Sequence, residues 1–228
     1  MRILQISSAR AFGGGERHLA DLARGLAERG HEVFAALSTS SPLRDKLEPV
    51  QPSNLFALPL RGPLDLASAA RLARIAREHK AEIIHAHVAR DYTLAALAAR
   101  LAPRARLVVT RHVLFPLSRV HRRALANVAR VIAVSEPVAR ALRSQNIFDA
   151  DRLRVVENGV DLARFGRARA EAEGERRAAG RPLRVGIVGE LSEVKGQEDF
   201  VRAAALLADE FAGRVEFLIV GADPARSG

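Results

Sequence analysis

The chain has 228 residues, 48% of them hydrophobic, so it is long enough for one good hydrophobic core or two small ones. It contains no cysteine, which excludes disulfides, cysteine-ligated zinc and thiol catalysis. Its formal net charge of +10 comes almost entirely from arginine, in an alanine-rich sequence that suggests a coding bias, and it favours anionic lipid or phosphorylated substrates as partners.

Other classes of protein are excluded by what the sequence lacks. No apolar run approaches the ~18 residues of a membrane span, and Met1 leads directly into a predicted strand instead of a basic leader. One tyrosine and no tryptophan leave little for bases to stack on, so nucleic acid is not an expected partner. We therefore expect a soluble, cytoplasmic protein, with peripheral contact at the inner membrane face left open.

The opening stretch predicts a strand at Ile3–Ile6, a helix from near Glu16 and a strand at Val33–Leu37. Between the first strand and the helix stand three consecutive glycines, Gly13, Gly14 and Gly15. Glycine lets the backbone take positive φ and leaves its N–H groups open, and the positive end of the helix dipole faces the same place. The loop is a candidate phosphate site, although a tight strand-to-helix turn explains the glycines equally well.

The same alternation continues along the chain. Further strands are predicted at Leu55–Leu58, Glu82–His87, Arg106–Thr110 and Val131–Ser135. Helices are predicted at Leu64–His79, Tyr92–Leu101, Ser118–Ala129 and Glu136–Ser144. Strands alternating with helices of this length predict an α/β fold, a doubly wound parallel sheet with helices on both faces.

A second domain is predicted after a change of composition. Residues 161–182 are rich in charge, glycine and alanine and are predicted to be a linker between residues 1–160 and 183–228. The opening pattern then returns as strand Leu183–Val188, a loop to Gly196, helix Gln197–Ala208 and strand Val215–Val220. Because one βαβ unit cannot cover both faces of its sheet, we expect the chain to be truncated relative to a complete two-domain protein.

Six segments together resemble a known family. In order, they are GGGERHLADLARGLAERGHEV, IIHAH, VVTRH, VIAVSE, VVENGVD and VGELSEVKG. They are similar to the sequence motifs of the family 4 glycosyltransferases of GT-B fold, which are retaining, nucleotide-sugar-dependent enzymes. The resemblance covers the whole chain, as the Rossmann-like N-terminal, acceptor-side domain plus the first βαβ unit of a Rossmann-like, nucleotide-sugar-binding domain.

The resemblance implies a nucleotide diphosphate sugar as donor and a glycan, lipid or small molecule as acceptor. It implies no cofactor and no metal, so that backbone donors, helix N-termini and cationic side chains would neutralise the departing diphosphate. Gly13, Gly14 and Gly15 fit that role from the first domain, and Lys195 fits it from the second; Lys195 as a solvated turn residue is the alternative. The fragment itself is expected to be inactive.

Histidines supply the other candidates. His112 follows a strand end, where ligands collect in open parallel sheets, and the resemblance implies that it contacts the transferred sugar; a structural histidine bonded to the backbone is the alternative. His85 and His87 lie two apart on one strand, a spacing that suits a metal, but no nearby carboxylate or cysteine completes a set. We therefore interpret His85 as structural and His87 as a candidate cleft residue.

Two polar residues complete the candidate cleft, and one acid departs from the family pattern. Ser135 is expected to cap the following helix, and Asn158 has the chemistry of a tight turn. Glu190 stands where the family usually places an arginine, and a carboxylate there would repel a diphosphate unless it turns away.

Two functions from other classes remain open. A strand and glycine loop also begin the fold of nicotinamide-dependent oxidoreductases, but His18 occupies the third fingerprint position, and Ser38 and Thr39 stand where an acid should hold the ribose. The positive charge is also compatible with a non-catalytic module that binds anionic lipid or phosphate.

Overall fold

The computed structural model describes residues 1–48, 50–118, 120–163 and 182–221. The chain divides into two compact units, Met1–Gly159 and Val160–Gly228, which are described separately. Most of the predicted linker, residues 164–181, lies outside the described residues, as do residues 222–228 at the end of the predicted second domain.

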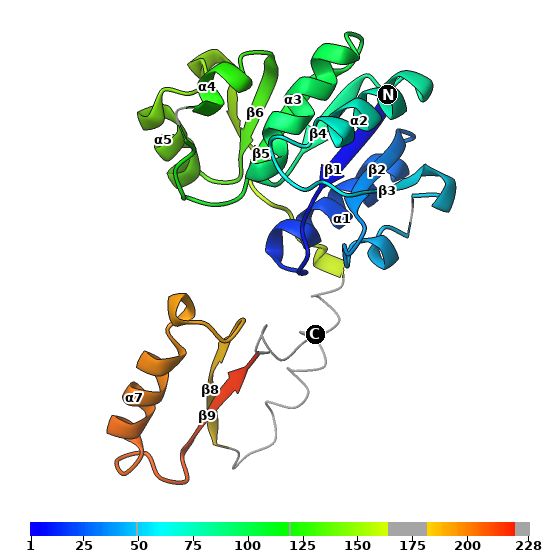
Figure 1. Cartoon of the computed structure of the whole chain (residues 1–228). Helices are drawn as coiled ribbons and strands as arrows, with labels where there is room; N and C mark the ends of the chain where they lie inside the picture. The colour runs from blue at the N-terminus through cyan, green and yellow to red at the C-terminus, as the bar shows by residue number, and fades with distance from the viewer. Residues whose placement is uncertain (49, 119, 164–181, 222–228) are drawn as a thin grey trace. The chain divides into compact units, whose positions relative to one another are not determined.

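The first unit is built on one seven-stranded sheet in the order β3-β2-β1-β4-β5-β6-β7 (Figure 1). All of its strand pairs are parallel. The strands are β1 (Arg2–Ser7), β2 (Glu32–Ser38), β3 (Leu55–Leu58), β4 (Ile83–Ala86), β5 (Arg106–Arg111), β6 (Val128–Ala133) and β7 (Leu153–Val155). The predicted parallel α/β sheet is thereby confirmed.

Helices connect these strands. They are α1 (Gly14–Glu28), α2 (Leu66–Glu78), α3 (Tyr92–Leu101), α4 (Val120–Ala124) and α5 (Glu136–Gln145), with 3₁₀ turns η1 (Arg44–Lys46), η2 (Pro52–Asn54), η3 (Ala89–Asp91) and η4 (Ala150–Arg152). In the described part of the chain, no helix is both long and apolar enough to cross a membrane.

The two faces of the sheet bury separate cores, because side chains alternate along each strand. Phe34 and Ala36 of β2 join the larger core with apolar residues of α2, α3 and α5. Val33, Ala35 and Leu37 of the same strand join a smaller core with α1. Since α1 covers one face and the later helices cover the other, the sheet is doubly wound, as predicted.

The chain reverses direction in the sheet between β1 and β4. From β1 it moves outward through β2 to β3, then crosses back to place β4 on the other side of β1 and continues to β7. At such a switch point the loops after neighbouring strands diverge and leave a crevice at the carboxyl ends of the strands. The segments after β1, β4 and β5 meet there, which determines where a ligand can bind.

Two predicted elements differ clearly from the structure, and one strand was not predicted. The helix predicted over Ser118–Ala129 is limited to Val120–Ala124, because Val128 already begins β6. β6 therefore covers Val128–Ala133 instead of Val131–Ser135. β7 was not predicted, since only three residues pair with β6 and just one of them is buried.

The second unit contains β8 (Leu183–Val188), the 3₁₀ turn η5 (Glu193–Lys195), α7 (Gln197–Leu207) and β9 (Val215–Val220). β8 and β9 pair in parallel from Leu183↔Val215 to Val188↔Val220. Its predicted strand–loop–helix–strand order is confirmed. Among its described residues none is buried, and Val188 is 80% exposed.

Candidate functional site

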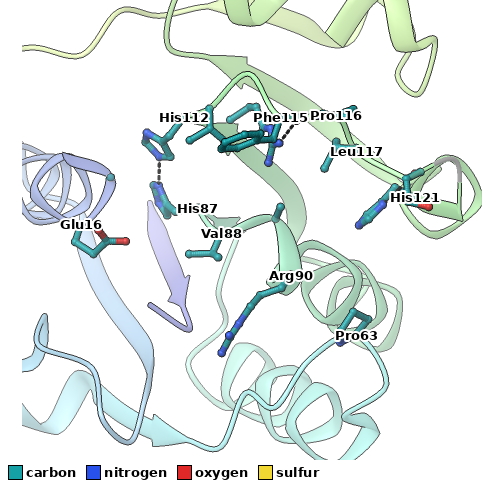
Figure 2. A pocket seen from close by; sticks show the side chains of 15 residues that line it. Glu16, Pro63, His87, Val88, Arg90, His112, Phe115, Pro116, Leu117 and His121 are labelled. Carbon is teal, nitrogen blue, oxygen red and sulfur yellow. Dashed lines mark hydrogen bonds between the residues drawn. The ribbon is translucent and has the colours of Figure 1, made fainter. Parts of the chain in front are cut away.

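A pocket of about 650 Å³ lies at the carboxyl ends of the central strands of the first unit (Figure 2). The start of α1, the segment after β4, and the end of β5 with the segment that follows it contribute polar side chains, including Glu16, His87, Arg90, Arg111, His112 and His121. Apolar side chains after β5 line the rest, including Phe115 and Leu117. The pocket thus combines a polar edge with an apolar wall.

The three glycines form the beginning of α1. Gly13 is the N-cap residue, with an extended backbone, and the helix starts at Gly14, two residues before the predicted start. None of the three glycines has the positive φ that the sequence led us to expect. The Glu16 carboxylate accepts the Gly13 N–H at 2.9 Å, whereas the next N–H groups have no carbonyl one turn earlier, as in any first helical turn.

Gly15 brings the helix start against His112. A Cβ atom added at Gly15 would lie 3.7 Å from His112 Cγ, which is ordinary van der Waals contact. The glycine segment and the histidine after β5, two of the residue groups predicted to be functional, are therefore neighbours in one pocket.

His112 is held in its neutral form. Burial is the main cause that lowers its pKa to about 4, and the positive charges of His18 and Arg111 lower it further. Its Nε2 atom lies 3.5 Å from Nδ1 of His87. A neutral imidazole has one donor and one acceptor nitrogen, so His112 can donate one hydrogen bond and accept another.

His87 and His85 are both buried, but their Nε2 atoms have different hydrogen-bond partners. His87 Nε2 lies 2.8 Å from Oε1 of Gln5, and His85 Nε2 lies 2.8 Å from Oγ1 of Thr110. Burial lowers the pKa of His87 well below its ordinary value and that of His85 to about 3. His87 reaches the pocket, whereas His85 is not among the residues that line it.

Sequence reasoning missed two residues at this pocket. Arg90 donates from Nε to Ser8 Oγ at 2.6 Å, and the Ser8 N–H donates to Asp91 at 2.7 Å, so the segments after β1 and β4 are fastened together. Arg111, 5% exposed, donates to the carbonyl of Phe115 and fixes the turn after β5. Arg111 lies in the VVTRH segment and Arg90 lies in none of the six segments, and neither arginine was predicted as a site residue; their place near strand ends was the available signal.

His18 was also missed as a site residue. It stands on α1, and its ring lies 5.1 Å from the His112 ring and 6.1 Å from the His87 ring, centroid to centroid. Its position within one turn of the glycines could have indicated it.

Two candidate cleft residues are not among those that line the pocket. Ser135 is the N-cap of α5 and accepts the Val138 N–H at 3.5 Å, as expected of a cap. Asn158 is exposed near the end of the first unit.

Lys195 belongs to the second unit, where it is exposed at the end of η5. A Cβ atom added at Gly189, after β8, would lie 3.8 Å from Cγ and Cδ of Lys195, so the lysine stem passes over that glycine. Glu190 is exposed and forms no ion pair with any residue in the described ranges, while its carbonyl accepts Nε2 of Gln197 at 2.8 Å.

Comparison with known protein families gives one match. The model of Glycosyltransferase Family 4 matches residues 12–164. A search of curated proteins found no significant relative of this chain.

Solved structures match over nearly the whole chain. The structure of Anabaena Alr3699/HepE in complex with UDP-glucose has a TM-score of 0.67 and 21% identity, over 98% of this chain and 70% of that chain. A glycosyltransferase from Rickettsia africae ESF-5 has a TM-score of 0.70 and 18% identity, over 97% and 69%. A UDP-GlcNAc 2-epimerase from Neisseria meningitidis bound to UDP-GlcNAc has a TM-score of 0.61 and 14% identity, over 96% and 65%. At these identities the comparison shows a shared fold.

Proposed function

This chain belongs to Glycosyltransferase Family 4, and from that premise we propose that it serves the transfer of a sugar from a nucleoside diphosphate sugar to an acceptor, with retention of anomeric configuration. Its fold is of the GT-B type that the sequence predicted, shared with the glycosyltransferase from Rickettsia africae. The observation that carries the proposal is that the glycine-rich start of α1 and a half-buried, neutral His112 lie side by side in one pocket.

The chemistry proposed for this pocket follows from its groups. As the sugar acquires positive character, the departing diphosphate must be neutralised, and the first-turn N–H groups of Gly14 and Gly15 at the positive end of α1 supply fixed donors. His112 offers a hydrogen bond to a sugar hydroxyl without bringing a second charge. Lys195 is proposed to add positive charge to the diphosphate, and no metal ion is assigned to the transfer.

The acceptor is proposed to occupy the wider part of the pocket. Phe115 and Leu117 offer an apolar surface, and Arg90 and Arg111 line the same space. A glycan or a lipid-linked acceptor fits this combination of apolar and cationic lining. We also propose peripheral contact with an anionic membrane on the cytoplasmic side, since Val113, Leu114 and Phe115 are 43%, 59% and 73% exposed.

UDP-glucose is the first donor to test, because Alr3699/HepE was solved with it. We expect residues 1–228 alone to lack turnover, because they span about 70% of that chain. The assay therefore uses this polypeptide extended to the length of its structural relatives, and measures donor hydrolysis and transfer for a panel of nucleotide sugars.

In that assay, His112→Ala and Lys195→Ala are each expected to lower kcat/KM by at least ~100-fold, since each removes an interaction made to the donor. His31→Ala is the control, because His31 lies beside the N-terminal amine at the start of β2 and not at the pocket. Unaltered rates in both test variants would refute these site assignments. Turnover of NAD(H) without any use of nucleotide sugars would favour the oxidoreductase alternative instead.

A further inference from the structure

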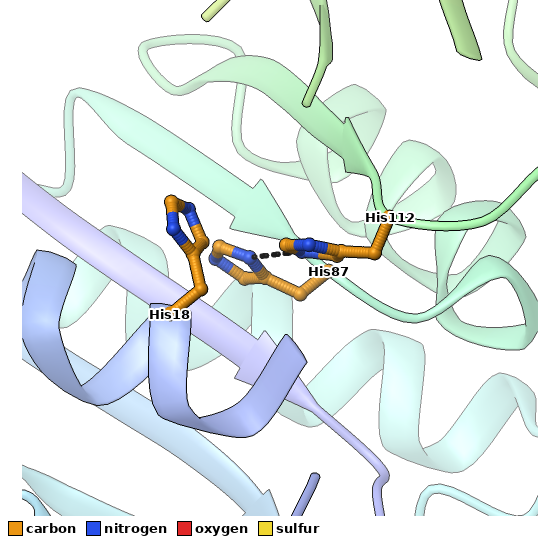
Figure 3. A group of neighbouring side chains, drawn as sticks. All are labelled: His18, His87 and His112. Carbon is orange, nitrogen blue, oxygen red and sulfur yellow. Dashed lines mark hydrogen bonds between the residues drawn. The ribbon is translucent and has the colours of Figure 1, made fainter. Parts of the chain in front are cut away.

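Three imidazoles from three different elements converge at the edge of the pocket (Figure 3). His18 comes from α1, His87 follows β4 and His112 follows β5. One ring nitrogen of each lies within 4.8 Å of the corresponding nitrogens of the other two. The sequence could not show this group, because it separates the three residues by whole strands and helices.

The nitrogen spacing already fits a metal ion for one pair. In a tetrahedral zinc site with Zn–N bonds of about 2.0–2.1 Å, two ligand nitrogens stand roughly 3.4 Å apart. His87 Nδ1 and His112 Nε2 are 3.5 Å apart. His18 is only half-buried on α1, so a side-chain rotation can bring its nitrogen closer.

Gln5 orients the buried member of the group. Its Oε1 atom lies 2.8 Å from His87 Nε2, and a carbonyl oxygen only accepts, so the proton of His87 is on Nε2. The lone pair of His87 is therefore on Nδ1, the atom that faces His112. Histidines that bind metals usually donate their other N–H to a carbonyl or carboxylate in this way.

The rings are available as ligands at neutral pH. Burial lowers the pKa of His18, partly opposed by Asp21, and burial also lowers the pKa of His87 and His112. Protons therefore do not compete strongly for the lone pairs. His112 Nδ1 is buried and has no hydrogen-bond partner among the described residues, so no hydrogen bond at that nitrogen fixes the tautomer of the ring.

We propose that His18, His87 and His112 form a binding site for a divalent transition metal ion, with Zn²⁺ as the ion that best suits three imidazoles and one open position. The proposed ion takes no part in the sugar transfer, because the proposed transfer reaction uses no metal. Because His112 is also the proposed sugar contact, a bound ion would compete with the donor there; only this consequence rests on the proposed function.

The test is titration of the metal-free chain, without an affinity tag, with Zn²⁺ alone by isothermal calorimetry. The visible spectrum of the Co²⁺-loaded chain provides a second readout, because tetrahedral nitrogen ligation gives characteristic absorption. We expect one ion per chain, and a loss of at least ~10-fold in affinity for His18→Ala and for His112→Ala. His121→Ala is the matched control, since His121 lines the same pocket outside the group of three, and it should bind as the unaltered chain does.

Fluorescence of Tyr92, the only tyrosine in a chain without tryptophan, checks that each variant is folded. His18→Ala is the decisive variant, because a half-buried side chain on an outer helix can be removed without unfolding the sheet. Equal Zn²⁺ affinity of the unaltered chain and folded His18→Ala would overturn the proposal, as would no binding at all. Neither result says anything about donor turnover. If donor turnover is absent, the measured metal site still stands.

Discussion

At the scale of single residues, burial determines the chemistry of this site more than residue type does. Gln5 is completely buried, and its carbonyl selects the tautomer of His87, which in turn contacts His112. His112 is half-buried, and the loss of solvent around its ring is the main reason that it is neutral, so it can exchange hydrogen bonds without adding a charge to the pocket. A residue on β1 thus influences a residue after β5 through one intermediate ring.

Asp91 provides a pH-dependent prediction at this scale. It is fully buried, and burial raises its pKa, although the Ser8 hydrogen bonds oppose this. A raised pKa means that the folded protein binds this proton more tightly than the unfolded chain does. The contribution of Asp91 to stability is therefore complete below the pKa of the unfolded state and is lost as pH rises through the pKa of the folded state.

Asp91→Asn should remove this dependence, because an amide retains an acceptor for Ser8 and cannot ionise. We expect the free energy of unfolding of the unaltered chain to fall relative to that of the variant as the pH rises above the ordinary pKa of an aspartate side chain. Urea titrations followed by circular dichroism measure the difference. Parallel pH profiles of the two proteins would show that the Asp91 carboxyl is not perturbed.

At the scale of elements, the segment between β5 and α4 has an unusual construction. Arg111 ties it down from inside through the Phe115 carbonyl, and the Leu117 N–H donates to Gln145 Oε1 at 2.8 Å. The apolar side chains between these ties are nevertheless exposed, and the exposed Arg122 and Arg123 of α4 follow closely. A fixed backbone that presents apolar and basic side chains is suited to a lipid surface.

We therefore expect Leu114→Ser/Phe115→Ser to lower co-sedimentation with anionic vesicles at least ~5-fold at low salt, and added salt to weaken binding of the unaltered chain. Leu101→Ser is the control. Leu101 is 46% exposed, but it ends α3, which runs back from the carboxyl ends of the strands toward their amino ends, away from the segment between β5 and α4. No binding of the unaltered chain to anionic vesicles at low salt would remove this proposal and the lipid-module alternative with it.

At the scale of the whole chain, the two units differ in how much they bury. Leu4 and Ile6 of β1, Ile84 of β4 and Leu107 of β5 are completely buried between layers of helices. Val188 and Val220, at the ends of β8 and β9, are 80% and 56% exposed. Buried apolar area is the main stabilising contribution to folding. The described part of the second unit buries much less apolar area, so we expect that unit to be less stable than the first.

Hydrogen–deuterium exchange of the intact chain should show this difference. We expect the amides of β8 and β9 to exchange at least ~100-fold faster than those of β1, β4 and β5, because local opening is easier where little apolar surface is buried. Mass spectrometry of peptic fragments gives both rates in one experiment. Equal protection in the two sheets would mean that the second unit gains its stability from contacts that burial does not reveal.

The features predicted from the sequence depend on neighbouring residues, and the features that were missed depend on contacts between distant segments. Apolar periodicity is local, so strands such as Leu55–Leu58 and helices such as Tyr92–Leu101 were predicted with their observed bounds. β7 and the short α4 were not, because pairing with β6 and the early start of β6 decide them. The contact of Gly15 with His112 depends on the sheet order, which no local pattern contains.

The position of β1 in the sheet has a consequence during synthesis. The ribosome makes β1 before the other strands of this sheet, yet β1 lies in the interior, with Ile3 paired to Val33 on one side and to Ile83 on the other. One of its hydrogen-bonding edges therefore stays open in the nascent polypeptide until β4 has emerged, and open edges invite pairing with other chains. Slower translation of the residues between β2 and β4 should therefore leave β1 open to such pairing for longer.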